Sequence, residues 1–263
     1  MTGAGDGATG SGRTVAVVGG TGTIGAPVVA ALLARGVAVR VLTRNATSLP
    51  AGAEHRRVDL TSGEGLADAL ADADAVVDTV NSTRKPKVTL VEGTRRLLEA
   101  GAAAGVGHHV TISIVGIEHI PSSYYRHKIS QERAVEGGPV PWSILRATQF
   151  HQLLDMAFGY ASRVGLRPTG AGKLQPVDPP VVAARLADVA LAAPAGRLPD
   201  IAGPKIATIS DLSSAWARAR GRRRVPLRIP SWGKAGKALT VGELCAPGGA
   251  AGGADFEEWL RHG

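Results

Sequence analysis

A short apolar run followed by a cluster of glycines constrains the fold of this chain more than any other feature. Residues 15–18 read Val-Ala-Val-Val, as expected for a strand buried on both faces. Four glycines follow within seven residues, and an alanine- and leucine-rich helical pattern covers residues 27–35. Strand, glycine turn and helix N-terminus together let the backbone approach a diphosphate and offer it free N–H groups. The sequence thus predicts a dinucleotide site. We assign to it Gly19, Gly20, Thr21, Gly22, Thr23, Ile24 and Gly25.

Strand-like and helix-like segments alternate beyond this turn. Strands are expected at residues 37–42, 57–60, 75–80, 109–114 and 142–150, and helices at 66–70, 86–104 and 124–135. This alternation predicts an α/β fold, a Rossmann-type doubly wound parallel sheet with its ligand site at the carboxyl ends of the strands. We divide the chain into a flexible tail (residues 1–12), an NAD(P)-binding Rossmann domain (13–150) and a small C-terminal substrate-binding region packed on the same domain (151–263).

The C-terminal region has weaker patterns. Helices are expected at residues 153–164, 181–192, 210–219 and 232–244, a last short turn at 256–260, and extended segments at 173–176, 201–206 and 225–229. Ser210 is expected to cap the third of these helices.

Composition excludes several classes of partner. The chain has one cysteine, Cys245, and no metal-ligand spacing, so we expect neither a disulfide nor a metal, and a cytoplasmic location. It has no apolar run near the ~20 residues of a membrane span. The net charge of +8 owes much to arginines at residues 218–224, which we interpret as a solvated helix end and not as a nucleic-acid site. A homodimer is left open.

Residues that follow the expected strands indicate the kind of dinucleotide. Arg44 comes directly after the second strand, where an acidic residue would bind the ribose of NAD. A cation there would pair with the 2′-phosphate of NADP, so we predict NADP(H). Asp59 after the third strand would contact the adenine amino group or open a turn. Val80 and Asn81 after the fourth strand are expected to lie beside the cofactor.

A second group of residues carries acid–base chemistry. Tyr124 and Lys128 are four residues apart, so a helix places them on one face, and Tyr125 is also within reach of Lys128. A phenol has a pKa near ~10, and a nearby ammonium lowers that value. We therefore predict that Tyr124 donates a proton with Lys128 as its partner. The alternative is an incidental pair on a core-facing helix.

These motifs together resemble the atypical, NmrA-like branch of the short-chain dehydrogenases/reductases. The resemblance covers residues 13–158 and includes the glycine turn, the strand-end Ser113, the Tyr124/Lys128 pair and the segment Trp-Ser-Ile-Leu-Arg-Ala-Thr-Gln-Phe at 142–150. It implies that Ser113 orients a substrate carbonyl and that Lys128 binds the nicotinamide ribose. It also implies that Thr148 and Gln149 line the nicotinamide site.

The expected substrate pocket lies where the C-terminal region folds over the strand ends. Residues proposed to line it are Tyr125, Gln149, Phe150, Met156 and Trp232. Because few cationic clamps occur in this region, we expect a small, fairly apolar substrate. The sequence predicts an NADPH-dependent oxidoreductase that reduces a carbonyl or an activated double bond with a Tyr–Lys proton relay. A non-catalytic NADP(H)-sensing regulator and a lyase or isomerase on the same scaffold are the alternatives.

Overall fold

The central element of the computed structural model, which describes residues 12–45, 48–222, 224–249 and 252–262, is a seven-stranded parallel sheet. Its strand order is β3-β2-β1-β4-β5-β6-β9. This order reverses between β1 and β4, as in a doubly wound sheet, and confirms the predicted fold class. The strands are β1 (Thr14–Val18), β2 (Ala38–Thr43), β3 (Ala53–Arg57), β4 (Ala75–Asp78), β5 (His108–Ile114), β6 (Trp142–Ala147) and β9 (Gly196–Arg197).

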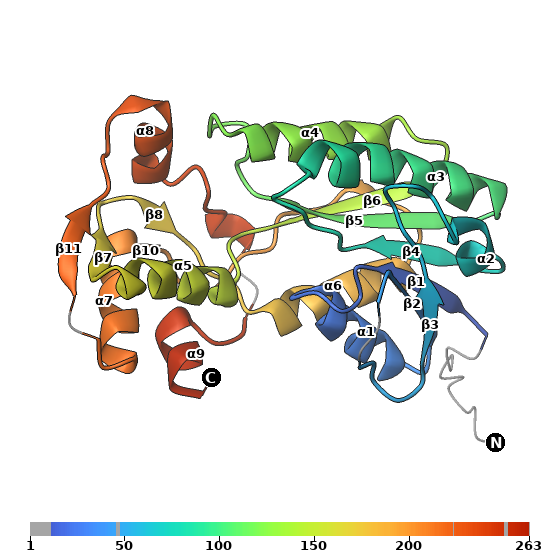
Figure 1. The fold of residues 1–263 in the computed structure, drawn as a ribbon, viewed down its shortest axis with the longest axis horizontal. Coiled ribbons are helices and arrows are strands. Elements are labelled where there is room, and N and C mark those ends of the chain that lie inside the picture. Colours follow the sequence, from blue (N-terminus) through green and yellow to red (C-terminus); the bar gives the residue numbers. More distant parts are fainter. Residues whose placement is uncertain (1–11, 46–47, 223, 250–251, 263) are drawn as a thin grey trace, which may run out of the picture.

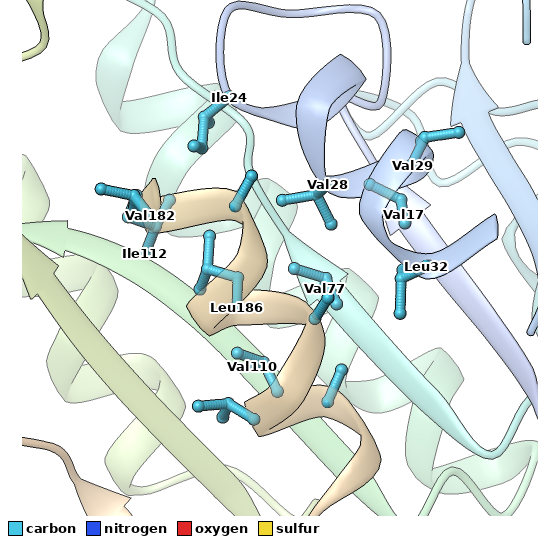
Figure 2. Close-up of a cluster of buried hydrophobic side chains, with 14 of the residues drawn as sticks. Val17, Ile24, Val28, Val29, Leu32, Val77, Val110, Ile112, Val182 and Leu186 are labelled. Carbon is cyan, nitrogen blue, oxygen red and sulfur yellow. The ribbon is translucent and has the colours of Figure 1, made fainter. Parts of the chain in front are cut away.

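Helices cover both faces of this sheet (Figure 1). On one face lie α1 (Gly25–Leu33) and α6 (Pro179–Leu191), and on the other α2 (Leu66–Leu70), the π-helical η1 (Lys87–Glu92), α3 (Gly93–Ala103) and α4 (Ser123–Glu136). Figure 2 shows Val17, Val77 and Val110 of three neighbouring strands pointing toward α1 and α6. The alternate strand residues pack against the other helical layer, which explains why the strands read as continuous apolar runs.

The remaining elements gather at one end of the sheet, beyond the carboxyl ends of its strands (Figure 1, left). They have a core of their own, in which Leu154, Phe158, Trp216 and Phe256 are buried. They are α5 (His151–Arg163), β7 (Leu166–Thr169), β8 (Lys173–Leu174), β10 (Ala207–Thr208), α7 (Ile209–Ala219), β11 (Val225–Arg228), α8 (Gly233–Val241), η2 (Pro247–Gly249) and α9 (Phe256–His262). β8 pairs with β10 and β7 pairs with β11.

The predicted division at residue 150 does not follow the packing. Helix α6 covers the central sheet next to α1, and β9 extends the sheet beside β6, although both come after residue 150. The C-terminal region therefore contributes one helix and one strand to the Rossmann layer. The tail predicted at residues 1–12 lies, except for Gly12, outside the described residues.

Some predicted boundaries are wrong. The third strand covers residues 53–57 and not 57–60, because this edge strand is polar and largely exposed while the apolar Val58 and Leu60 pack after it. Helix α7 is capped by Thr208, whose hydroxyl accepts a hydrogen bond from the backbone N–H of Asp211, and not by Ser210. The short strands β7, β9 and β10 were not predicted.

Among the described residues, none of the helices combines the length and apolar character needed to cross a lipid bilayer.

Candidate functional site

The turn after β1 leaves no room for a side chain at Gly20 or Gly25. Gly19 has a φ of +75°, and its backbone N–H donates to the carbonyl of Leu42 on β2 at 3.1 Å. A Cβ on Gly25 would lie 2.1 Å from the backbone oxygen of Gly19. A Cβ on Gly20 would lie 2.9 Å from the side chain of Val41. The predicted glycines therefore bring the start of α1 directly onto the end of β1.

The N-terminus of α1 is open to an anion. Its N-cap, Ile24, provides no side-chain hydrogen bond, and the first turn has no acidic residue. Thr21, Gly22 and Thr23 in front of it are exposed. Free backbone N–H groups and the positive end of the helix dipole favour a phosphate at this place. The geometry thus fits a dinucleotide diphosphate.

Thr79, directly after β4, is hydrogen-bonded to the end of β1. Its backbone N–H and its hydroxyl both donate to the carbonyl of Val18, at 3.1 and 2.7 Å. This places Val80 and Asn81 at the point where the strand order reverses, beside the glycine turn. Sequence reasoning missed Thr79, because a threonine after an apolar strand is common.

Arg44 and Asp59 lie near each other past the ends of β2 and β3. Arg44 is exposed. The Asp59 carboxylate accepts hydrogen bonds from the Thr61 hydroxyl at 2.7 Å and its backbone N–H at 2.8 Å. These bonds, with a smaller effect of Arg44, hold the pKa of Asp59 below its usual value. Asp59 therefore opens the turn that was one of its two predicted roles, and Arg44 remains open to an anion.

Tyr124 reaches the loop after β4. Its hydroxyl donates to Oδ1 of Asn81 at 2.8 Å. The ring of Tyr125 packs against the Tyr124 ring, with centroids 5.6 Å apart. Burial raises the pKa of Tyr124 to about 12; the hydrogen bond with Asn81 lowers it by a smaller amount, and the adjacent Tyr125 raises it slightly. The sequence-based expectation of a lowered pKa is therefore wrong for this phenol.

Lys128 does not lower the pKa of Tyr124, because its ammonium is directed to other groups. Its side chain points into the molecule, with 4% of its surface exposed, and its ammonium donates to the Ile112 carbonyl at 2.9 Å and to Gln131 Oε1 at 2.6 Å. Burial lowers the pKa of Lys128 to about 8. The ammonium is thus held beneath α4 and does not act on the phenol one turn away.

Gln131 connects Lys128 to the end of β4. Its amide nitrogen donates to Asp78 Oδ2 at 3.2 Å and to Thr94 Oγ1 at 3.1 Å. Asp78 in turn accepts from Thr94 at 3.0 Å and from the backbone N–H of Val80 at 3.0 Å. Sequence reasoning missed this buried network. A polar residue ending the apolar run at residues 75–78 was the available signal.

Ser113 lies at the end of β5, as predicted, but its side chain is buried. It is 2% exposed and points toward α4, where its hydroxyl forms no well-aligned hydrogen bond with another described residue. Glu132 lies opposite, held by two hydrogen bonds from Arg146 at 2.9 and 2.7 Å. Burial raises the pKa of Glu132, but the bonds from Arg146 and the nearby Ser113 outweigh it and lower that pKa. The hydroxyl is therefore enclosed beside a carboxylate and not presented to a substrate carbonyl.

Thr148 and Gln149, which follow β6, form hydrogen bonds with the C-terminal region. The Thr148 hydroxyl donates to the Gln175 carbonyl at 2.6 Å. The Gln149 amide nitrogen donates to the Leu244 carbonyl at 3.0 Å, and its oxygen accepts from the Gln175 backbone at 3.2 Å. Both side chains are buried and engaged. This differs from the predicted lining roles, because their polar atoms join the end of β6 to the C-terminal region.

The predicted apolar lining residues lie in different settings. Phe150 is half-buried and packs against the sheet core next to α6. Met156 and Trp232 are 51% and 78% exposed. Neither is therefore part of an enclosed pocket wall in this structure. Among these predicted lining residues, Tyr125 packs against the ring of Tyr124.

Comparison with known proteins agrees with this geometry. A family model described as NAD(P)H-binding matches residues 19–192. A curated relative from Streptomyces griseus, (4-alkanoyl-5-oxo-2,5-dihydrofuran-3-yl)methyl phosphate reductase, is 29% identical over 232 residues, which is 83% of this chain and 77% of the relative.

Solved structures share the fold at low identity. An NADPH-dependent quinone oxidoreductase from Escherichia coli, complexed with NADPH, superposes with a TM-score of 0.76 at 18% identity, over 94% of this chain and 99% of that one. The enzyme WbmH from Bordetella bronchiseptica, in complex with NAD+, superposes with a TM-score of 0.77 at 16% identity, over 95% of this chain and 96% of that one. The shared fold is therefore found with either nicotinamide dinucleotide.

Proposed function

This chain belongs to the NAD(P)H-binding family, and we propose that it is an NADPH-dependent oxidoreductase of the atypical, NmrA-like branch of the short-chain dehydrogenases/reductases. Its substrate is a small, fairly apolar molecule with a carbonyl group or an activated double bond. The observation that carries the proposal is the Tyr124 hydroxyl, which reaches the loop after β4 and hydrogen-bonds Asn81 beside the glycine turn. A reductase needs an acid at this place, next to the dinucleotide.

The residues present suit the reaction. When bound, the reduced nicotinamide supplies a hydride to the carbonyl carbon. Tyr124 stays protonated at neutral pH, because burial raises its pKa to about 12, and its hydroxyl gives that proton to the carbonyl oxygen. The glycine turn and the start of α1 hold the diphosphate. The exposed Arg44 pairs with the 2′-phosphate, which supports NADPH over NADH.

One observation favours a second candidate, an NADP(H)-binding regulator without turnover. A phenol with a pKa of about 12 is a weak acid, and Lys128, which faces the interior, does not activate it. Such a protein would bind the dinucleotide and transmit its redox state to a partner. The two candidates share the glycine turn and differ in what Tyr124 does.

Consumption of NADPH across a panel of aldehydes, ketones and quinones separates the two. We expect turnover with at least one class, faster with NADPH than with NADH. Tyr124→Phe should lower kcat by about a hundredfold, the contribution typical of a general acid, and leave NADPH binding by calorimetry unchanged. Tyr125→Phe is the matched control and should keep most of the rate. NADPH binding without consumption of any compound would favour the regulator.

A further inference from the structure

The bond between Tyr124 and Asn81 links two segments that are far apart in the sequence. Tyr124 lies in the first turn of α4, and Asn81 lies in the exposed loop that follows β4. Their side chains meet at 2.8 Å, with the phenol donating and the amide oxygen accepting. The two residues are 43 positions apart, so the fold and not local sequence creates this contact.

Lys128 cannot supply the same contact in this arrangement. Its ammonium is buried beneath α4 and donates to a β5 carbonyl and to Gln131. Gln131 is itself bound to Asp78 and Thr94, so reorienting Lys128 would break a buried network. The amide of Asn81 is therefore the polar group that holds the phenol.

A carboxamide suits a phenol that gives up its proton. Its oxygen accepts a hydrogen bond from the neutral hydroxyl, and its nitrogen, after rotation of the amide, donates to a phenolate. A carboxylate at the same position serves only the first state, because it has no proton to donate and repels the second.

We propose that Asn81 is a positioning residue for Tyr124, a role that rests on the proposed function of the site. In the free protein the single O–H of Tyr124 is donated to Asn81 Oδ1. When the substrate binds, Asn81 rotates its amide so that the nitrogen donates to the phenol oxygen, and the freed O–H bond breaks as its proton passes to the substrate oxygen that has gained negative charge from hydride addition. The amide nitrogen then donates to the resulting phenolate until solvent water returns a proton. Lys128 fixes α4 to the sheet and takes no part in this transfer.

The test uses a signal that needs no turnover. The chain has three tyrosines, so Tyr125→Phe and Tyr160→Phe leave Tyr124 as the only one. Incorporation of fluorotyrosine, which is more acidic than tyrosine, brings its titration into an accessible pH range and gives one fluorine resonance. Asn81→Asp should raise the pKa of this residue by about one unit or more, since a like charge then faces the phenolate. Ser82→Asp, the same charge one residue along, should shift it less.

Activity provides the second readout. With a compound that supports NADPH consumption, Asn81→Ala and Asn81→Asp should lower kcat at saturating NADPH by about tenfold or more and move the alkaline limb of the kcat–pH profile. Asn81→Gln, which keeps the carboxamide, should recover part of the rate.

An unchanged fluorine titration in both Asn81→Asp and Asn81→Ala would overturn the positioning role, whatever the activity. Two variants are used so that a folding defect in one does not decide the matter. Absence of NADPH consumption by the unmodified protein would instead count against the proposed function, while the titration would still report on the contact. The two failures are therefore distinguishable.

Discussion

The ammonium of Lys128 makes stability depend on pH. Burial lowers its pKa from 10.5 in the unfolded chain to about 8 in the folded one. Between these values the unfolded state binds more protons, so the free energy of unfolding rises with pH. Relative to Lys128→Met, the unmodified protein should gain about 2 kcal/mol between pH 8 and pH 10, as measured by urea unfolding at both.

Lys87→Met provides the control for this measurement. The Lys87 side chain is 73% exposed, so its replacement should give the same difference in stability at both pH values. A pH-independent difference for Lys128→Met as well would mean that the ammonium is hydrated in solution and not enclosed by Ile112 and Gln131.

For single residues, the sequence predicted their positions in helices and strands better than the directions of their side chains. The spacing of Tyr124 and Lys128 predicted one helical face, but the direction of Lys128 depends on Asp78 and Gln131, which no local pattern connects to it. Ser113 lies at a strand end as predicted, yet the alternation along β5 turns it toward Glu132. Side-chain direction depends on neighbouring strands and helices that one segment does not encode.

The contact between β1 and α1 depends on a glycine. A Cβ on Gly25 would meet the Gly19 backbone oxygen at 2.1 Å, and backbone cannot yield as a flexible side chain does. Gly25→Ala should therefore push α1 off the end of β1, destabilise the protein by about 1–3 kcal/mol and weaken NADPH binding by about a hundredfold or more. Thermal unfolding and calorimetry give the two numbers.

Gly107→Ala is the matched substitution outside the turn. The nearest atom to its added Cβ would be a carbonyl oxygen at 3.6 Å, an ordinary contact, so folding and NADPH binding should both be retained. Full NADPH affinity in Gly25→Ala would show that the turn does not need its tight approach and would remove the basis for the diphosphate site.

Elements with a strong apolar pattern were the ones that the sequence predicted. Helix α2 has the predicted bounds, and β1 differs from its prediction by one residue, because their buried faces repeat over several residues. Strand β3 was misplaced because its exposed side chains carry no apolar run. The two-residue strands β9 and β10 were missed because they depend on pairing partners distant in the sequence.

In the whole molecule, the buried amides of Gln149 and Gln175 connect the end of the central sheet to the C-terminal region. The doubly wound parallel sheet could be predicted, since alternating strands and helices have few allowed connections. The return of α6 and β9 to the sheet could not be predicted, because it depends on packing beside α1 and on pairing with β6, which are distant in the sequence. The role of Gln175 could not be predicted either. Its amide nitrogen donates to the Gly203 carbonyl at 2.7 Å, and its amide oxygen accepts from the Ala246 backbone N–H at 2.9 Å.

Removal of this amide should loosen one part of the molecule and leave the sheet intact. Gln175→Leu deprives the buried Gly203 carbonyl and the Ala246 N–H of their partner, at a cost of about 1–3 kcal/mol. Hydrogen exchange should speed up at residues 242–249 and stay slow in β1. Gln152→Leu is the control, because Gln152 Oε1 has no hydrogen-bond partner among the described residues. If exchange instead rises equally in both regions, the C-terminal segment and the sheet open together, and Gln175 does not stabilise the C-terminal segment alone.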